Sequence, residues 1–127
     1  MILDTGIKMR DFRQLKVWEE AHELTLEIYQ VTKNYPKDEL FGLTSQMRRS
    51  GSSIPTNIAE GCGRETNKDY AHFLQIALGS AFELDYQILL SKDLSYIDQQ
   101  TFAGLNNRVD KVRRQLANLI RKVRASA

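Results

Sequence analysis

Apolar residues recur at helical spacing along most of this chain. Two segments, 15–35 and 102–123, carry apolar positions in alternating steps of three and four residues, which is typical of one face of a helix. Pro36 ends the first predicted helix, because the residue before a proline disfavours helical geometry. The two stripes consist of Val17, Ala21, Leu24, Ile28, Val31 and Tyr35, and of Phe102, Leu105, Val109, Val112, Leu116, Leu119 and Val123.

The segment 66–94 is apolar on more than one face. Thr66 and Asp69 have the spacing of a helix-capping box, with aspartate in place of glutamate, and predict where a helix begins. One stripe comprises Tyr70, Phe73, Ala77, Ala81, Leu84 and Ile88. A second comprises Leu74, Leu78, Phe82 and Leu89.

A helix that is apolar nearly all round must be buried on more than one side, whereas each helix of a small bundle keeps one face in water. The second stripe therefore predicts self-association. Trp18 and Tyr29 lie on another flank of the first helix and belong either to a wide core or to the same interface. The candidate subunit interface is thus Trp18, Tyr29, Leu74, Leu78, Phe82 and Leu89.

The central segment 43–62 keeps its apolar stripe in phase across Pro55. A proline inside a helix lacks an N–H and presses on the carbonyl four residues earlier, here that of Gly51. One interpretation is a single kinked helix from 43 to 62, and we favour it because the stripe keeps phase. The alternative is a break, with Ser53 as the N-cap of a new helix. Gly61 and Gly63 are interpreted as C-cap residues.

Four long amphipathic helices, short connections and no strand-like alternation predict an all-α protein, an up-down-up-down four-helix bundle. Residues 1–13 are interpreted as a flexible N-terminal lead-in and residues 14–127 as the bundle domain. At 127 residues with 42% hydrophobic content, the chain suffices for one domain with its own core.

One cysteine, Cys62, excludes an intramolecular disulfide and fits a reducing compartment. The longest uncharged run has 13 residues, from Tyr70 to Phe82, short of the roughly 20 that span a bilayer. No basic and apolar leader opens the chain. We expect a cytoplasmic protein without a membrane partner.

Positive charge gathers in the last predicted helix, where residues 98–127 hold seven basic side chains against two acidic ones. Such a cluster is a candidate phosphate-binding surface, and Arg48, Arg49 and Arg64 are candidates to extend it. The alternative is a solvated face that complements the helix dipole. The candidate nucleic-acid-binding residues of this helix are Arg108, Lys111, Arg113, Arg114, Arg121, Lys122 and Arg124.

The residues that usually carry chemistry form no recognisable set. The two histidines, His22 and His72, and the one cysteine have no zinc-ligand spacing, and no hydrolase or nucleotide-binding motif occurs. We therefore assign no catalytic, cofactor-binding or metal-binding residue and expect a protein that is not an enzyme.

Two runs resemble a known bacterial family: Thr44–Arg64 (TSQMRRSGSSIPTNIAEGCGR) and Tyr70–Leu84 (YAHFLQIALGSAFEL), with Val17-Trp18 nearer the start. The family comprises four-helix-bundle proteins encoded by intervening sequences within 23S rRNA genes. Gly51 and Ser52 depart from its more usual alanine and valine, and Cys62 from an aromatic residue.

The resemblance implies a bundle that assembles into a ring, with five subunits as the expected number, and no assigned enzymatic activity. A related group, the accessory proteins of diversity-generating retroelements, forms basic pentameric barrels that bind nucleic acid and a reverse transcriptase. By analogy, we expect a non-enzymatic, bacterial, pentameric protein that binds RNA or DNA, or a nucleic-acid-processing protein, through arrayed basic residues. The alternative hypothesis is a protein-interaction scaffold that binds no nucleic acid itself.

Overall fold

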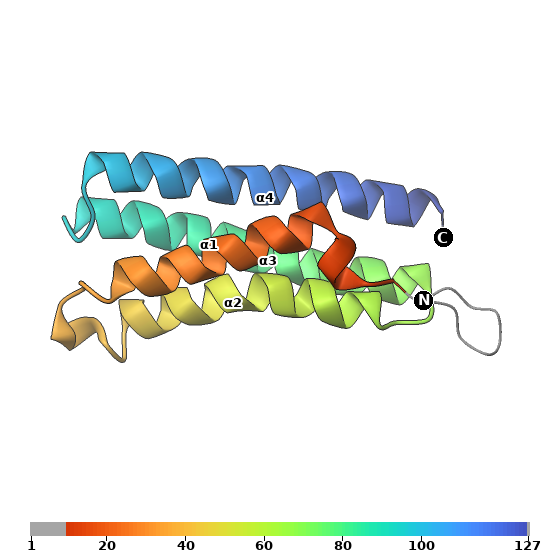
Figure 1. Cartoon of the computed structure of the whole chain (residues 1–127), viewed down its shortest axis with the longest axis horizontal. Coiled ribbons are helices and arrows are strands. Elements are labelled where there is room, and N and C mark those ends of the chain that lie inside the picture. Colours follow the sequence, from red (N-terminus) through yellow and green to blue (C-terminus); the bar gives the residue numbers. More distant parts are fainter. Residues whose placement is uncertain (1–9, 127) are drawn as a thin grey trace.

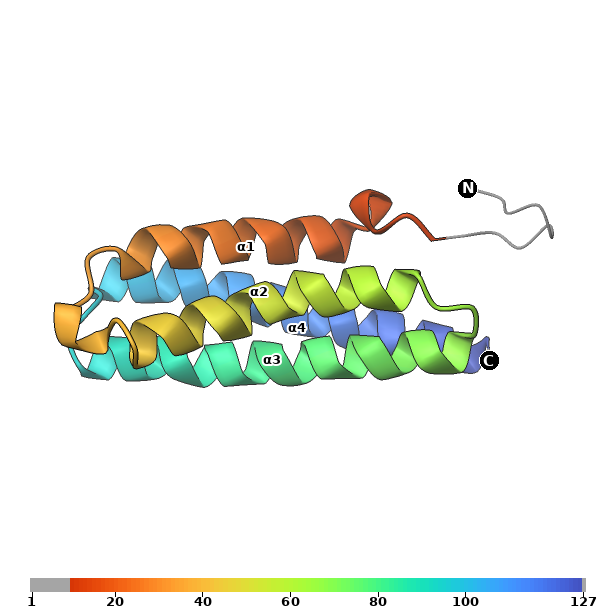
Figure 2. The same cartoon turned by 90° about the horizontal axis from the view of Figure 1, so that it is seen from below.

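Four helices account for most of the residues that this computed structural model describes, which are 10–126. They are α1 (Lys16–Thr32), α2 (Leu43–Cys62), α3 (Asn67–Asp93) and α4 (Gln99–Ala125), and two short 3-10 turns precede α1 and α2, η1 (Phe12–Gln14) and η2 (Lys37–Glu39). Consecutive helices run in opposite directions, so α1 begins at the end of the bundle where α4 finishes (Figures 1 and 2). No strand occurs within 10–126. The predicted all-α class and up-down-up-down bundle are confirmed.

The starts of α3 and α4 follow from their caps. The Thr66 hydroxyl accepts a hydrogen bond from the Asp69 amide at 3.1 Å, as the sequence predicts. The Asp98 carboxylate accepts one from the Thr101 amide at 2.8 Å. Each cap satisfies an amide that has no partner within the helix.

The helix α2 continues through Pro55 from Leu43 to Cys62, so the single-helix interpretation is confirmed and a break at Ser53 is wrong. Gly63 is the C-cap residue, in right-handed geometry with φ of −83°. Gly61 is not a cap: it lies inside α2, where a Cβ would stand 3.0 Å from Cδ1 of Tyr70. The absence of a side chain there allows α3 to approach α2 closely.

The core forms where the four apolar faces meet. Each helix touches its two neighbours around the bundle, and α1 lies diagonally across from α3 (Figures 1 and 2). The α1 stripe is buried except for Val31, which is half-buried. On α4, Ile120 is buried whereas Leu119 and Phe102 are only partly covered. The apolar stripes therefore predicted the core with shifts of one position.

Residues 10–13 of the predicted lead-in contact the bundle. The Arg10 guanidinium lies 4.1 Å from the centre of the Tyr70 ring and donates to the Arg64 carbonyl at 2.9 Å. The Phe12 ring lies 4.9 Å from that of Trp18. The rest of the predicted lead-in, residues 1–9, lies outside the described residues.

Candidate interaction surfaces

Most basic residues along the middle of α4 are paired with carboxylates of the same subunit. Arg108 and Lys111 reach across to α1, while Arg113 joins α4 to α3. The pairs are Arg108–Glu27 at 3.3 Å, Lys111–Glu20 at 3.1 Å, Arg113–Asp85 at 3.7 Å, Arg113–Asp110 at 2.6 Å and Arg114–Asp110 at 2.7 Å. These four cations are partly neutralised where they stand, which favours the solvated-face interpretation for this part of the predicted surface.

The last turns of α4 differ. Arg121, Lys122 and Arg124 are exposed and have no carboxylate within 4 Å among residues 10–126. Arg121 donates to Asn118 and Arg124 to Gln75, which are neutral acceptors. Their charges therefore remain available to an anion.

The antiparallel topology brings two further lysines to the same end of the bundle. Lys122 and Lys16 line one shallow depression, and Arg124 and Lys68 line another. We call this set the basic end: Lys16, Lys68, Arg121, Lys122 and Arg124. The sequence interpretation missed Lys16 and Lys68, although the predicted topology already placed the start of α1 and the start of α3 beside the end of α4.

The three arginines of the central segment have separate surroundings. Arg64 lies 3.9 Å from Glu60 and covers the Phe73 ring. Arg48 donates to the Thr32 hydroxyl at 3.0 Å and lies over the Tyr29 ring. Neither Arg48 nor Arg49 has a carboxylate within 4 Å in the described part of the chain. Arg48 and Arg49 thus do not join the basic end, which lies beyond the opposite end of α2. Arg64 follows α2 at the same end of the bundle as the basic end, but it is paired with Glu60.

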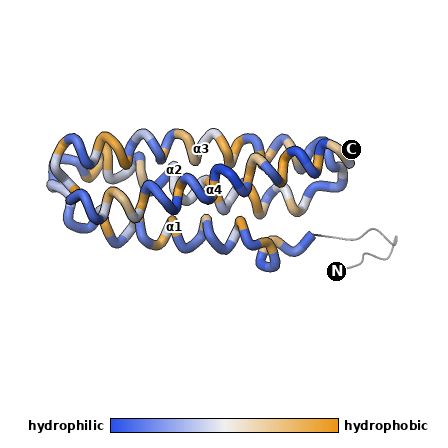
Figure 3. Tube along the Cα trace, turned by 90° about the horizontal axis from the view of Figure 1, so that it is seen from above, coloured by the Kyte–Doolittle hydropathy of each residue, from blue (hydrophilic) through white to orange (hydrophobic). Residues whose placement is uncertain are grey.

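An apolar strip remains exposed along the outer face of α3. We call it the α3 ridge, and it consists of Ile76, Gly79, Phe82, Tyr86 and Leu89. Phe82 is 54% exposed and Tyr86 62%. A Cβ at Gly79 would meet nothing within 4 Å in the described part of the chain outside its own helix backbone. Repeated hydrophobic positions follow α3, whereas α4 is coloured mainly hydrophilic (Figure 3).

The predicted interface residues fall into two groups. Leu74 is completely buried inside the subunit, so its assignment to an interface is wrong: it lies on the core-facing side of the second stripe. Leu78 and Trp18 are half-buried and pack on the core. Tyr29, Phe82 and Leu89 are exposed. The second stripe therefore straddles the edge of the core.

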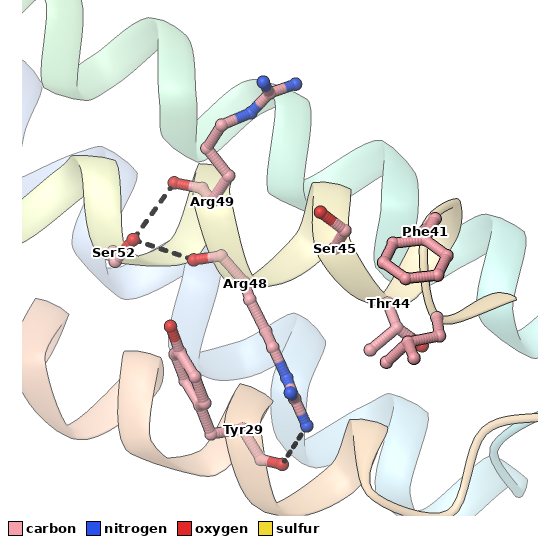
Figure 4. A pocket seen from close by; sticks show the side chains of 8 residues that line it. Tyr29, Phe41, Thr44, Ser45, Arg48, Arg49 and Ser52 are labelled. Atoms are coloured by element: carbon pink, nitrogen blue, oxygen red, sulfur yellow. Dashed lines mark hydrogen bonds between the residues drawn. The ribbon is translucent and has the colours of Figure 1, made fainter. Parts of the chain in front are cut away.

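A groove runs between α1 and α2 on another side of the bundle. One part, of about 530 Å³, is lined by Tyr29, Phe41, Ser45 and Arg48 among others, and it meets a second part at Ser52. The second part, of about 340 Å³, includes Trp18 and Ala59. Phe41 is 93% exposed. Figure 4 shows the side chains that line the first part, Phe41 among them. We call this the α1–α2 groove.

Two titratable groups are buried where α2 meets α3. Burial raises the pKa of the Cys62 thiol, which lies 3.9 Å from the Tyr70 hydroxyl. Burial also raises the pKa of Tyr70, with a further contribution from Cys62. Both groups are therefore neutral at physiological pH, and this part of α2 and α3 serves packing.

Within residues 10–126, no cluster of three or more His, Cys, Asp or Glu side chains could hold a metal ion. None of the described helices has the length and hydropathy needed to span a bilayer.

The fold and these surfaces define a small all-α protein of the four-helix-bundle class. A model of the family described as 23S rRNA-intervening sequence protein matches residues 13–118, and the chain belongs to that family. Its helices superpose on a crystal structure from Bacteroides thetaiotaomicron, a protein of unknown function from the S23 ribosomal protein family. The TM-score is 0.77 at 27% identity, over 83% of this chain and 95% of the other. No curated protein matches the chain.

Proposed function

We propose that this protein is a non-enzymatic, cytoplasmic homo-oligomer that binds RNA or DNA through its basic end, with a pentamer as the expected assembly. The observation that carries this proposal is the contrast along α4. Arg108, Lys111, Arg113 and Arg114 are paired with acids, whereas Arg121, Lys122 and Arg124 have no carboxylate partner within residues 10–126. Lys122 lies near Lys16, and Arg124 lies near Lys68.

Self-association multiplies this charge. The exposed α3 ridge supports an oligomer, because contiguous apolar strips on soluble proteins usually mark contact surfaces. In a ring with cyclic symmetry whose helices run along the axis, the basic ends stand together at one rim. A phosphate backbone that meets several copies gains affinity by releasing several counterions.

The names of related proteins agree with an RNA partner. The family is named for sequences that interrupt 23S rRNA, and the similar structure belongs to a family named for a ribosomal protein. These names support RNA as the first nucleic acid to test.

The experiment measures binding of labelled single-stranded RNA and duplex DNA over a series of salt concentrations. The test variant is Arg121→Glu with Arg124→Glu, and the control is Lys33→Glu with Lys37→Glu, the same charge change at the opposite end of the bundle. We expect the test variant alone to lose at least about tenfold in affinity and to flatten the salt dependence. Equal losses in both variants, or no binding of wild-type protein at low salt, would contradict the proposal.

A protein-interaction scaffold is the second candidate, favoured by the paired cations of α4 and by the open α1–α2 groove. A partner captured from cell extract equally well with and without nuclease would support it. Loss of the partner on nuclease treatment would support nucleic-acid binding instead.

A further inference from the structure

Two apolar surfaces of this subunit are exposed on different sides of the bundle. The α3 ridge protrudes on one side, with Phe82, Tyr86 and Leu89 all more than two-fifths exposed. The α1–α2 groove is hollowed on another, with Phe41 almost fully exposed at its rim. The α3 ridge is convex and the α1–α2 groove is concave, so the two surfaces are complementary in shape.

We propose that the α3 ridge of one copy lies in the α1–α2 groove of the next copy, head to tail. This inference rests on the self-association in the proposed function and names the two surfaces that meet. Because α1 lies diagonally across from α3, the ridge and the groove face different sides of the subunit. Two copies related by a two-fold axis therefore cannot each place their ridge in the other's groove. The contact therefore repeats from copy to copy, and a repeat that closes makes a ring.

The dimensions of the two surfaces agree. From Ile76 to Leu89 the ridge comprises 14 residues, and the 13 steps between its ends make about 20 Å at 1.5 Å per residue. Along α1 the groove extends from Trp18 to Tyr29, about 16 Å by the same rise, and Phe41 lengthens it. A helix laid in the groove contacts it along about three turns at a pitch of 5.4 Å.

Gly79 would allow the second copy to approach the backbone of α3 closely. It stands in the middle of α3, where glycine costs up to about 1 kcal/mol relative to alanine. Apart from its chain neighbours and the backbone of its own helix, no atom of residues 10–126 lies within 4 Å of the place its Cβ would take, so packing inside the subunit does not require a glycine. A second copy against the ridge would approach the backbone most closely here.

The charges that have no partner within residues 10–126 are opposite on the two surfaces; Arg113 also lies over the Phe82 ring of the ridge, but it is paired with Asp85 and Asp110. Arg48 is half-buried at the groove wall and donates to the Thr32 hydroxyl, which is neutral. It also donates to the neutral Tyr29 carbonyl at 3.4 Å (Figure 4). No carboxylate of residues 10–126 lies within 4 Å of it. The ridge is flanked by Glu83 and Asp93, which make no ion pair in that part of the chain either. When the ridge lies in the groove, the carboxylates beside the ridge and the Arg48 guanidinium come near each other, and the opposite charges attract.

The test mixes two variants, each with one damaged surface. The ridge variant carries Tyr86→Lys and Leu89→Lys, and the groove variant carries Phe41→Lys and Ser45→Lys. All four residues are exposed, so both subunits keep their cores. The control variant carries Leu94→Lys and Ala103→Lys, which are exposed residues outside both surfaces. Circular dichroism checks folding, and light scattering measures mass against the subunit mass of 14.6 kDa.

We expect each variant alone to be monomeric, with an apparent dissociation constant raised at least about tenfold, while the control assembles like the wild type. An equimolar mixture should give dimers of one copy of each and nothing larger, because only one intact ridge faces one intact groove. If wild-type protein is monomeric, the homo-oligomer of the proposed function fails. If wild type assembles and the groove variant still does, or if the mixture gives no dimer, this inference alone is overturned.

Discussion

The Thr25 hydroxyl of α1 lies 2.9 Å from the Gly51 carbonyl of α2 and donates a hydrogen bond to it. Gly51 stands four residues before Pro55, which has no N–H to donate, so this carbonyl lacks its helical partner. The same hydroxyl is 2.8 Å from its own helix's Ala21 carbonyl and shares its one proton between the two acceptors. A neighbouring helix therefore provides the bond that Pro55 removes.

The first prediction concerns this bond. Thr25→Val keeps the shape of the side chain but leaves the buried Gly51 carbonyl without a donor, and we expect a loss of about 1–3 kcal/mol in the free energy of unfolding. Pro55→Ala restores an N–H four residues after Gly51. In the Pro55→Ala background the cost of Thr25→Val should fall by about 1 kcal/mol, since the carbonyl is then satisfied within α2. Urea denaturation of the four proteins measures the coupling; strictly additive costs would show that the hydroxyl does not serve this carbonyl.

The second prediction concerns the close approach of α2 and α3. A Cβ at Gly61 would lie 3.1 Å from Cβ of Phe73 and 3.3 Å from the Tyr70 carbonyl oxygen, so Gly61→Ala should destabilise the protein by about 1–3 kcal/mol. Gly104 is the matched control, because a Cβ there meets nothing within 4 Å in α4. Gly104→Ala should stabilise by up to about 1 kcal/mol. Thermal denaturation compares them, and equal effects of the two substitutions would contradict the role given to Gly61.

Much of this fold could be predicted because the apolar residues keep helical phase. The steps of three and four gave all four helices, and Thr66 with Asp69 gave the start of α3 to the residue. The end of α1 was placed three residues too late. Residues 33–35 continue the chain as tight turns, with the Tyr35 amide bonded to the Thr32 carbonyl, and hydropathy alone does not separate such turns from a helix.

The surfaces were harder to predict, because they depend on partners distant in sequence. Leu74 and Phe82 share one stripe of α3, yet Leu74 is buried and Phe82 exposed, since the neighbouring helices cover only part of that stripe. Arg108 and Lys111 were assigned to a basic cluster because their carboxylate partners, Glu27 and Glu20, lie about eighty to ninety residues earlier in the sequence. A count of charge by segment does not show ion pairs between helices.

The third prediction concerns pH. The Thr101 amide, which donates to the Asp98 carboxylate, holds the pKa of that group below its ordinary value of about 3.9. A lowered folded-state pKa stabilises the protein above the unfolded pKa, and this contribution disappears as pH falls through the folded value. Asp98→Asn keeps a capping oxygen but does not titrate. Urea denaturation at pH 6 and pH 3 should therefore show a larger loss of stability for wild type than for the variant, and identical losses would exclude this role of Asp98.

The fourth prediction concerns Cys62, whose thiol is buried and whose pKa is raised. Since the thiolate is the reactive form, iodoacetamide at pH 8 should modify the native protein at least about tenfold more slowly than the unfolded protein. The control is an exposed cysteine, Asn107→Cys, in a Cys62→Ala background. That cysteine should react at similar rates in both states. Mass spectrometry measures the rate of modification. Rapid modification of Cys62 in the native protein would show that α2 and α3 separate readily at this point.

The last prediction tests whether ion pairs limit the basic surface of α4. Arg108, Lys111 and Lys122 are separated by steps of three and eleven residues and lie on the flank of α4 that faces α1, where Glu27 and Glu20 neutralise the first two. Replacing both carboxylates with glutamine frees two cations in line with the basic end. Because the ion pairs are partly exposed, we expect the loss of each pair to lower the free energy of unfolding by no more than about 1 kcal/mol.

If nucleic acid binds at the basic end and along this flank, Glu20→Gln with Glu27→Gln should raise the affinity for RNA. It should also steepen the slope of log affinity against log salt, by about 0.7 for each added phosphate contact on a single strand. Glu19→Gln with Glu23→Gln makes the same change in net charge on α1, at exposed residues that form no ion pair within 10–126. Fluorescence anisotropy titrations from low to moderate salt compare the two pairs. An equal gain would mean that net charge alone governs binding, and no gain in either would place the nucleic acid away from this side of α4.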